Sequence, residues 1–150
     1  MWNDIKTEVD INSLISLFGH FHDSCIKEIR YVSGAFVDKD LSMNPVNDKR
    51  TVDMVFQRQY KNPMAIVIRF NGLAVLHLAP FNDNYTCEIH DAIVFFKNGY
   101  TYWADCSGRI ENEIESYDGT WICAKKIQWC IIDEYIGNDE IFQAKFESSK

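Results

Sequence analysis

The sequence predicts an α+β fold in which an N-terminal helix packs on a curved, largely antiparallel sheet of about six to eight strands, arranged as a partial barrel or a sandwich. Three observations lead to this prediction. Residues 8–18 repeat apolar side chains at helical spacing, β-branched and aromatic residues fill several later segments, and two Asn-Gly pairs separate apolar segments in the middle of the chain. The 150 residues, of which 47% are apolar, suffice for one globular domain spanning residues 1–150.

The predicted helix covers residues 8–18. Its apolar side chains recur at the spacing of one helix face: Ile11, Leu14, Ile15 and Phe18. Asp10 or Asn12 is available as the N-terminal cap, and Gly19 supplies the stop. We therefore expect a single apolar stripe that covers one side of the sheet.

Three segments have the composition of strands. Residues 25–37 alternate imperfectly and end near Gly34, and residues 51–60 alternate until the break at 61–63. Residues 120–132 are predicted to form a strand with one shared face: Trp121, Cys123, Ile127, Trp129 and Ile131. Residues 41–50 are predicted to be a loop, because Asn44-Pro45 is followed by a polar run.

Each Asn-Gly pair predicts a two-residue hairpin turn, because both central residues of a type I′ turn need a positive φ. Asn71-Gly72 would join 64–70 to 73–79, as a central hairpin that is apolar on both faces. Asn98-Gly99 would join 86–97 to 100–107. The second hairpin gives five facing pairs: Phe95 with Tyr102, Val94 with Trp103, Ala92 with Asp105, Asp91 with Cys106, and His90 with Ser107.

The connections between these segments are polar. Residues 107–119 contain few apolar side chains and are predicted to form an exposed acidic connection with at most a single helical turn. Residues 138–146 are a candidate short helix, although segments of that length are marginal without tertiary support.

Composition excludes several function classes. With 22 acidic and 15 basic residues the net charge is −7, which opposes binding to nucleic acids and favours a basic partner. The first residues include acids and no apolar signal region, and no stretch approaches the ~18 uncharged apolar residues of a membrane span, so we expect a cytoplasmic protein. Five cysteines without a C-x-x-C pair give no zinc ribbon and no disulfide framework. No dinucleotide, P-loop, hydrolase-elbow or H-E-x-x-H motif occurs, so no cofactor is expected.

His20, His22 and Asp23 are the candidate metal ligands. On a strand, His20 and His22 would point the same way, as H-x-H ligands do, while Asp23 would point to the other face. A third donor would have to come from His77 or from His90-Asp91, and nothing in the spacing shows that they converge. The interpretation that we favour is a junction between helix and strand in which the polar groups bond turn amides, and a metal-dependent hydrolase is the alternative.

His90, Asp105 and Ser107 are the candidate catalytic residues. They would share one face of the second hairpin, which places a base, an orienting acid and a hydroxyl within reach of one another. The chain lacks a nucleophile elbow and a glycine-rich oxyanion loop. A polar cluster near the end of a sheet is therefore the favoured interpretation.

An acidic surface with interleaved aromatic residues is the candidate binding site. Its members are Glu111, Glu113, Glu115, Asp118, Tyr117 and Trp121. Acids beside tyrosine and tryptophan suit an interface with a basic protein. The simpler interpretation is solvated surface next to core aromatic residues.

The string Phe21-His22-Asp23-Ser24, between a predicted helix and a predicted strand, resembles the N-terminal signature of a group of small bacterial proteins. Some of these are grouped with the immunity proteins of polymorphic toxin systems. The resemblance implies a non-enzymatic cytosolic protein that binds and blocks a toxin, with no catalytic residues to transfer. We therefore expect a protein-binding domain. Besides the metal-dependent hydrolase, a small-ligand-binding barrel is the alternative, and it would have a cavity between helix and sheet.

Overall fold

The computed structural model describes residues 1–46 and 49–141. In these residues the chain forms, in order, β1 (Asn3–Ile5), α1 (Glu8–Leu17), the 3-10 turn η1 (Gly19–Phe21), β2 (Ser24–Val32), β3 (Phe36–Val37), β4 (Met43–Asn44), β5 (Thr51–Arg58), β6 (Ala65–His77), β7 (Glu88–Ile89), β8 (Ile93–Lys97), β9 (Tyr100–Ala104), the 3-10 turn η2 (Ile114–Ser116) and β10 (Trp121–Ile131). No helix in these ranges is long and apolar enough to cross a membrane.

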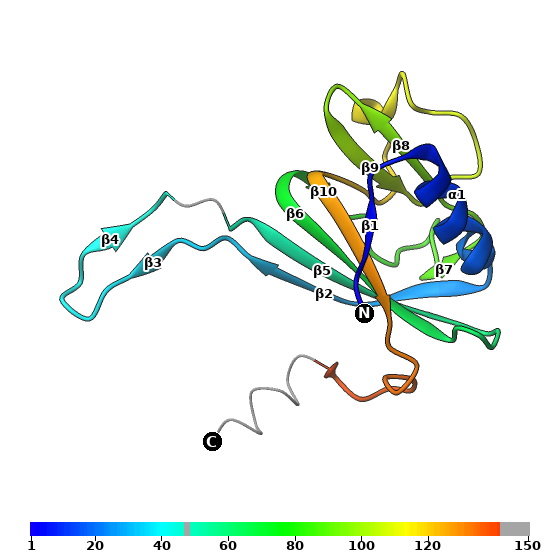
Figure 1. The fold of residues 1–150 in the computed structure, drawn as a ribbon, viewed down its shortest axis with the longest axis horizontal. Coiled ribbons are helices and arrows are strands. Elements are labelled where there is room, and N and C mark those ends of the chain that lie inside the picture. Colours follow the sequence, from blue (N-terminus) through cyan, green and yellow to red (C-terminus); the bar gives the residue numbers. More distant parts are fainter. Residues whose placement is uncertain (47–48, 142–150) are drawn as a thin grey trace.

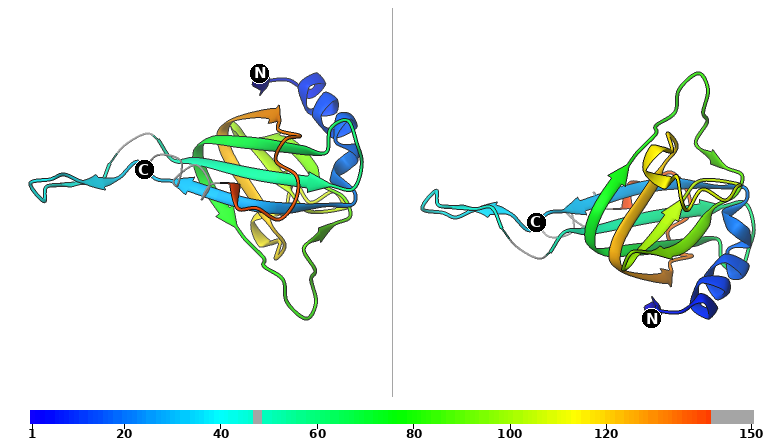
Figure 2. Two further views of the ribbon diagram at one scale, coloured as in Figure 1. Left: turned by 90° about the horizontal axis from the view of Figure 1, so that it is seen from below. Right: turned by 90° about the horizontal axis from the view of Figure 1, so that it is seen from above.

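Eight of the strands form one antiparallel sheet. Its order is β7-β2-β5-β6-β10-β9-β8, and β1 pairs with β10. Figures 1 and 2 show that this sheet curls strongly into a half-barrel, with α1 at one end. The prediction of a helix on a curved, antiparallel sheet is therefore confirmed, in its partial-barrel form.

Side chains fill the concave side of the half-barrel. Two strands, β6 and β10, separate Phe56 on β5 from Trp103 on β9, yet the ring centroids of these two residues are 5.1 Å apart. Phe21 from η1 packs edge-on against both, with centroid distances of 5.0 and 5.7 Å. Phe18 follows at the end of α1, 5.0 Å from Phe21. These rings occupy the space in which a ligand-binding barrel would hold its ligand.

The convex side of the sheet is covered in two places. Over β8, β9 and β10, Ile114 from η2 packs on Tyr102 and Trp121. Over β5 and β6, Ile141 packs on Val55 and Val67. The acidic connection is therefore anchored by a buried isoleucine, which the count of its apolar residues did not predict, while its single helical turn is confirmed as η2.

Different features define the two ends of α1. Thr7 is the N-cap: its Oγ1 accepts from the Asp10 amide at 3.2 Å, and the Asp10 carboxylate accepts from the Thr7 amide at 2.8 Å. The predicted caps Asp10 and Asn12 are therefore wrong, because Asp10 occupies position N3 of a capping box whose N-cap is Thr7. Gly19, with φ of 58°, follows the C-terminal end as predicted.

The hairpin at Asn98-Gly99 is confirmed. Asn98 and Gly99 have φ of 52° and 80°, as a type I′ turn requires, and Phe95 lies opposite Tyr102. The ladder ends at the pair Ile93–Ala104. The expected pairs beyond it are therefore wrong: Ala92 with Asp105, Asp91 with Cys106, and His90 with Ser107. The chain before β8 turns away instead, and β7 pairs with β2.

The hairpin predicted at Asn71-Gly72 does not form, so that prediction is wrong. β6 runs unbroken through this pair, because its Ala65–Phe70 half bonds to β5 and its whole length from Ile66 to His77 bonds to β10. Gly72 has φ of 68°, but Asn71 is not in the positive-φ region, so the requirement for two such residues is not met. The register between β6 and β10 shifts two residues further on, where Cys123 pairs with Val75 and Ala124 with Leu73.

Two strands depart from the predicted alternation of faces. In β2 the register shifts between Ile26 and Glu28, which accounts for the imperfect alternation. In β10, Ile122 and Ile127 belong to the concave core while Trp121 and Cys123 lie on the convex side, so the single face predicted for 120–132 is wrong.

The strand predicted over 25–37 is two strands, β2 and β3, and the predicted loop 41–50 contains β4. Of the helix predicted over 138–146, residues from 142 onward lie outside the described residues.

Candidate functional site

A polar cleft of about 300 Å³ lies where the segments after β9 and before β10 meet β7 and the loop that precedes it. Its lining includes all three candidate catalytic residues, His90, Asp105 and Ser107. All three residues lie beyond the end of the β8–β9 ladder, so the predicted hairpin register is not what brings them together. The structure thus brings them together without pairing them across strands.

Backbone contacts hold Asp105 in place at the rim of the sheet. Its amide donates to the Thr120 carbonyl at 2.9 Å, and its carbonyl accepts from the Tyr117 hydroxyl. Tyr117 is in turn joined to the start of β10, because its own carbonyl accepts from Trp121 Nε1 at 3.2 Å. The carboxyl of Asp105 therefore projects from a fixed backbone into the cleft.

The Asp105 carboxyl has an unusual acidity. Burial raises its pKa to about 6, and the nearby charge of His90 opposes that rise. A carboxyl that titrates near neutral pH can take up or release a proton there. However, no hydrogen bond in the described residues joins Asp105, His90 and Ser107, and a nucleophile activated by a base needs such a bond. The cleft therefore lacks the assembled geometry of a triad.

Asp91 is the second notable acid of the cleft. Its Oδ1 atom is buried and makes no hydrogen bond, and the ring nitrogen Nδ1 of His20 lies 3.9 Å away, too far for one. Glu88 adds a third carboxyl to the lining. The cleft as a whole therefore suits a cationic group better than an anionic one.

The candidate metal ligands do not converge. His22 Nδ1 lies 3.0 Å from Asp23 Oδ2, which also accepts from the Tyr60 hydroxyl at 2.8 Å, while His20 faces Asp91. The reason is local: His20 has φ of 56° within η1, so the alternation expected of a strand does not apply. Within residues 1–46 and 49–141, no three His, Cys, Asp or Glu side chains are grouped so that they could hold a metal ion.

The acids of the candidate binding surface lie in different surroundings. The Glu115 carboxylate accepts from Lys97 Nζ at 3.0 Å, and the Asp118 carboxylate accepts from the Tyr85 hydroxyl at 3.3 Å. Glu113 is exposed and Glu111 is half-buried. Glu113, Glu115 and Asp118 are exposed, as the sequence predicts for 107–119, but Glu115 and Asp118 already have partners.

The two aromatic residues of that surface have structural contacts. Trp121 is only 5% exposed and stacks on Tyr102, with the ring centroids 6.1 Å apart. Tyr117 is half-buried, and its hydroxyl is bonded to Asp105. Trp121 therefore offers almost no area to a partner, and both rings mainly fasten the acidic connection to the sheet.

The feature that sequence reasoning missed is a projecting arm, residues 33–46. Figures 1 and 2 show it extending from the end of β2 and β5, away from the rest of the sheet. Its β3 and β4 strands pair only two residues each, Phe36 with Asn44 and Val37 with Met43. Five large apolar side chains of the arm are more than half exposed: Phe36, Val37, Leu41, Met43 and Val46. The sequence does contain a signal for the arm. Large apolar residues continue through a segment that its Asn-Pro pair and polar residues predict to be a loop.

The tip of the arm has an unusual backbone. The Leu41 amide donates to the Asp38 carbonyl at 2.8 Å, and the Asp38 amide donates to the Ser42 carbonyl at 2.9 Å, which closes a tight turn. Leu41 has φ of 70° and is 83% exposed. Glycine or asparagine would adopt this conformation at lower cost, so the leucine side chain is held out to solvent against the local preference.

Comparison of the chain with protein-family models, with curated proteins and with solved structures finds no match.

Proposed function

We propose that this protein is a non-enzymatic binding domain and that its partner is a protein that packs on the arm. The observation that carries the proposal is the row of exposed apolar side chains on a ribbon of two strands. Apolar surface gains about 25 cal/mol for each Å² removed from water, so large exposed apolar groups gathered on one projection favour association. A two-stranded ribbon is also marginal by itself in water, and a partner would stabilise it.

Leu41 is the centre of the proposed interface. A leucine in the left-handed region costs about 1 kcal/mol or more relative to glycine, and among residues 1–46 and 49–141 its side chain stays 83% exposed, so burial there does not offset that cost. Strained residues of this kind cluster where they contact a ligand or a partner. Val37 and Met43, which lie opposite each other on the ribbon, extend the apolar contact toward the body of the protein.

The proposed partner has a basic surface. The net charge of −7 speeds the approach of a positively charged protein, and this long-range effect does not require acids on the arm itself. A toxin blocked by an immunity-type protein is one such partner, in line with the resemblance of residues 21–24. The acids at 111, 113, 115 and 118 are proposed to contribute to this attraction.

Affinity capture with matched variants tests the proposal. Tagged full-length protein is cross-linked in the cells that carry the gene, and the retained proteins are quantified for the wild type and two double variants. The arm variant is Leu41→Ser with Met43→Ser. The control is Val9→Ser with Ile136→Ser, which removes exposed apolar side chains from α1 and from the segment after β10.

The proposal expects a basic protein that the wild type and the control retain equally and that the arm variant loses by at least about tenfold. Equal retention of every captured protein by all three forms would refute it. Sedimentation of the purified wild type and arm variant separates one further outcome. If the arm variant converts a dimer to a monomer, the arm binds a second copy of this chain, and the proposal of a basic partner on the arm is wrong.

A further inference from the structure

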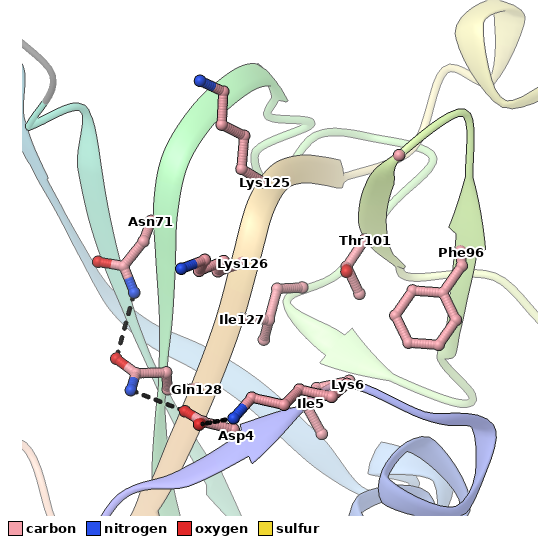
Figure 3. Close-up of a pocket in the computed structure, with 11 residues that line it drawn as sticks. Asp4, Ile5, Lys6, Asn71, Phe96, Thr101, Lys125, Lys126, Ile127 and Gln128 are labelled. Carbon is pink, nitrogen blue, oxygen red and sulfur yellow. Dashed lines mark hydrogen bonds and ion pairs between the residues drawn. The ribbon is translucent and has the colours of Figure 1, made fainter.

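A second cavity lies on the opposite side of β10 from β6. Along that edge β10 pairs with β9 over Trp121–Ala124 and with β1 over Ile127–Trp129, which leaves Lys125 and Lys126 without a strand partner there. A pocket of about 500 Å³ opens in this gap, between β1 and the β8–β9 hairpin (Figure 3). We call it the lysine pocket.

The charge of the lysine pocket is opposite to that of the chain. Its lining contains three lysines, Lys6, Lys125 and Lys126, and one acid, Asp4, in a protein of net charge −7. Asp4 lies 2.8 Å from Lys6 Nζ, whereas Lys126 has no carboxylate within 4.0 Å among the residues that the structure describes. Figure 3 shows Lys125 pointing away from the other two, so Lys6 and Lys126 are the cations that a ligand would meet.

Hydrogen bonds fix the polar wall of the pocket. Gln128 Nε2 donates to Asp4 Oδ1 at 2.9 Å, and Gln128 Oε1 accepts from Asn71 Nδ2 at 3.2 Å. Figure 3 shows this chain of contacts running from Asn71 through Gln128 and Asp4 to Lys6. Lys6 therefore already has the Asp4 carboxylate beside its ammonium group, and a bound anion would share Lys6 with that carboxylate.

The opposite wall is apolar. Phe96 on β8 is 39% exposed and faces the pocket together with Ile127 and the buried Thr101. The turn residue Gly99 carries no side chain, and an added Cβ would meet no atom within 4 Å. An exposed ring beside open space offers a stacking surface to a flat group.

We propose that the lysine pocket binds a small aromatic anion of the nucleoside phosphate class. Its phosphate would lie between Lys6 and Lys126, and its ring would lie against Phe96. The volume is within the range of about 300–1,000 Å³ that is usual for small-molecule sites. This inference is independent of the arm, because none of its residues belongs to 33–46.

Isothermal titration calorimetry at low salt tests the site with three probes: AMP, adenosine and inorganic phosphate. Lys126→Gln removes the unpaired cation, and Lys61→Gln is the matched control, an exposed lysine that does not line this pocket. Phe96→Ala removes the ring. Thermal unfolding of each variant shows whether the fold is kept.

The proposal expects saturable binding of AMP that Lys126→Gln weakens by about tenfold and that Lys61→Gln leaves unchanged. Phe96→Ala should weaken AMP and leave phosphate unchanged. Three results would overturn the assignment: no saturable binding of AMP at millimolar concentration, equal weakening by the two lysine variants, or phosphate and AMP of equal affinity.

Discussion

Substitution of Gly72 tests whether β6 is one strand. Gly72 combines two constraints, a φ of 68° and a close approach to Lys125, whose Cδ, Cβ and Cγ would lie 3.1, 3.2 and 3.2 Å from an added Cβ. The first constraint costs a non-glycine residue about 1 kcal/mol, and the second costs up to about 1 kcal/mol more, because the stem of Lys125 must move. Gly72→Ala should therefore lower the free energy of unfolding by about 2 kcal/mol, and Gly72→Val by more.

Two other glycines separate the two contributions. Gly99 has φ of 80° and Gly108 has no positive φ, and an added Cβ would meet nothing within 4 Å at either position. Gly99→Ala should therefore cost about 1 kcal/mol, while Gly108→Ala should be neutral or slightly stabilising. The assay is urea denaturation of the three alanine variants and the wild type, with the slope checked for constancy.

A double-mutant cycle with Lys125→Ala completes the design. If β6 is continuous, the two substitutions should couple, because truncation of Lys125 removes two of the three close contacts with residue 72. In an isolated Asn71-Gly72 hairpin turn, Lys125 would not touch the substituted residue. Independent effects of the two substitutions, or a Gly72→Ala variant as stable as Gly108→Ala, would refute the reasoning.

Three further predictions concern the acidic cleft, the acidic connection and the helix. Burial raises the pKa of Asp105 to about 6, above its unfolded value, so the free energy of unfolding should fall as pH rises from about 4 to about 6. Allowing for solvent screening, the fall is at most about 2 kcal/mol, and urea titrations of Asp105→Asn should show it reduced; identical pH profiles would contradict the raised pKa. Ile114→Ala should cost about 2–4 kcal/mol in denaturation, because Ile114 is fully buried, and a loss below about 1 kcal/mol would mean that the connection is not anchored. Thr7→Ala should cost about 1 kcal/mol and Thr7→Ser little, and equal midpoints for all three forms would exclude Thr7 as the cap.

The fold class could be predicted because it depends on patterns that run along whole segments. Helical spacing over 8–18 and β-rich composition over 51–60 and 120–132 each give the right element. The two Asn-Gly pairs show where local patterns fail. Both sit between apolar segments, yet only Asn98-Gly99 reverses the chain, since the long register with β10 keeps β6 extended through Asn71-Gly72. That register is a long-range contact, which a dipeptide does not encode.

Bulges limit the prediction of faces in the same way. One extra residue in a strand exchanges inside and outside for everything beyond it. Trp121 and Ile127 were predicted to share a face and lie on opposite sides of the sheet. The change of face in β10 falls between Ala124 and Ile127, opposite Gly72 of β6, so it could not be read from β10 alone.

Part of the candidate site could be predicted, and part could not. His90, Asp105 and Ser107 do line one cleft, although the register that suggested it is not formed. The arm was missed because the prediction of a loop does not say whether that loop packs on the sheet or projects into solvent. Side chains such as Leu41 and Met43 become informative only when the structure shows that they are exposed.

The most direct test of the proposed function is the affinity of the captured partner for Leu41→Asn. Asparagine tolerates the left-handed backbone, so the tip should keep its turn and the unfolding midpoint should stay at the wild-type value. The account predicts that the dissociation constant rises by at least about tenfold, because the leucine side chain is lost from the centre of the interface. A partner that binds Leu41→Asn as tightly as the wild type would contradict it.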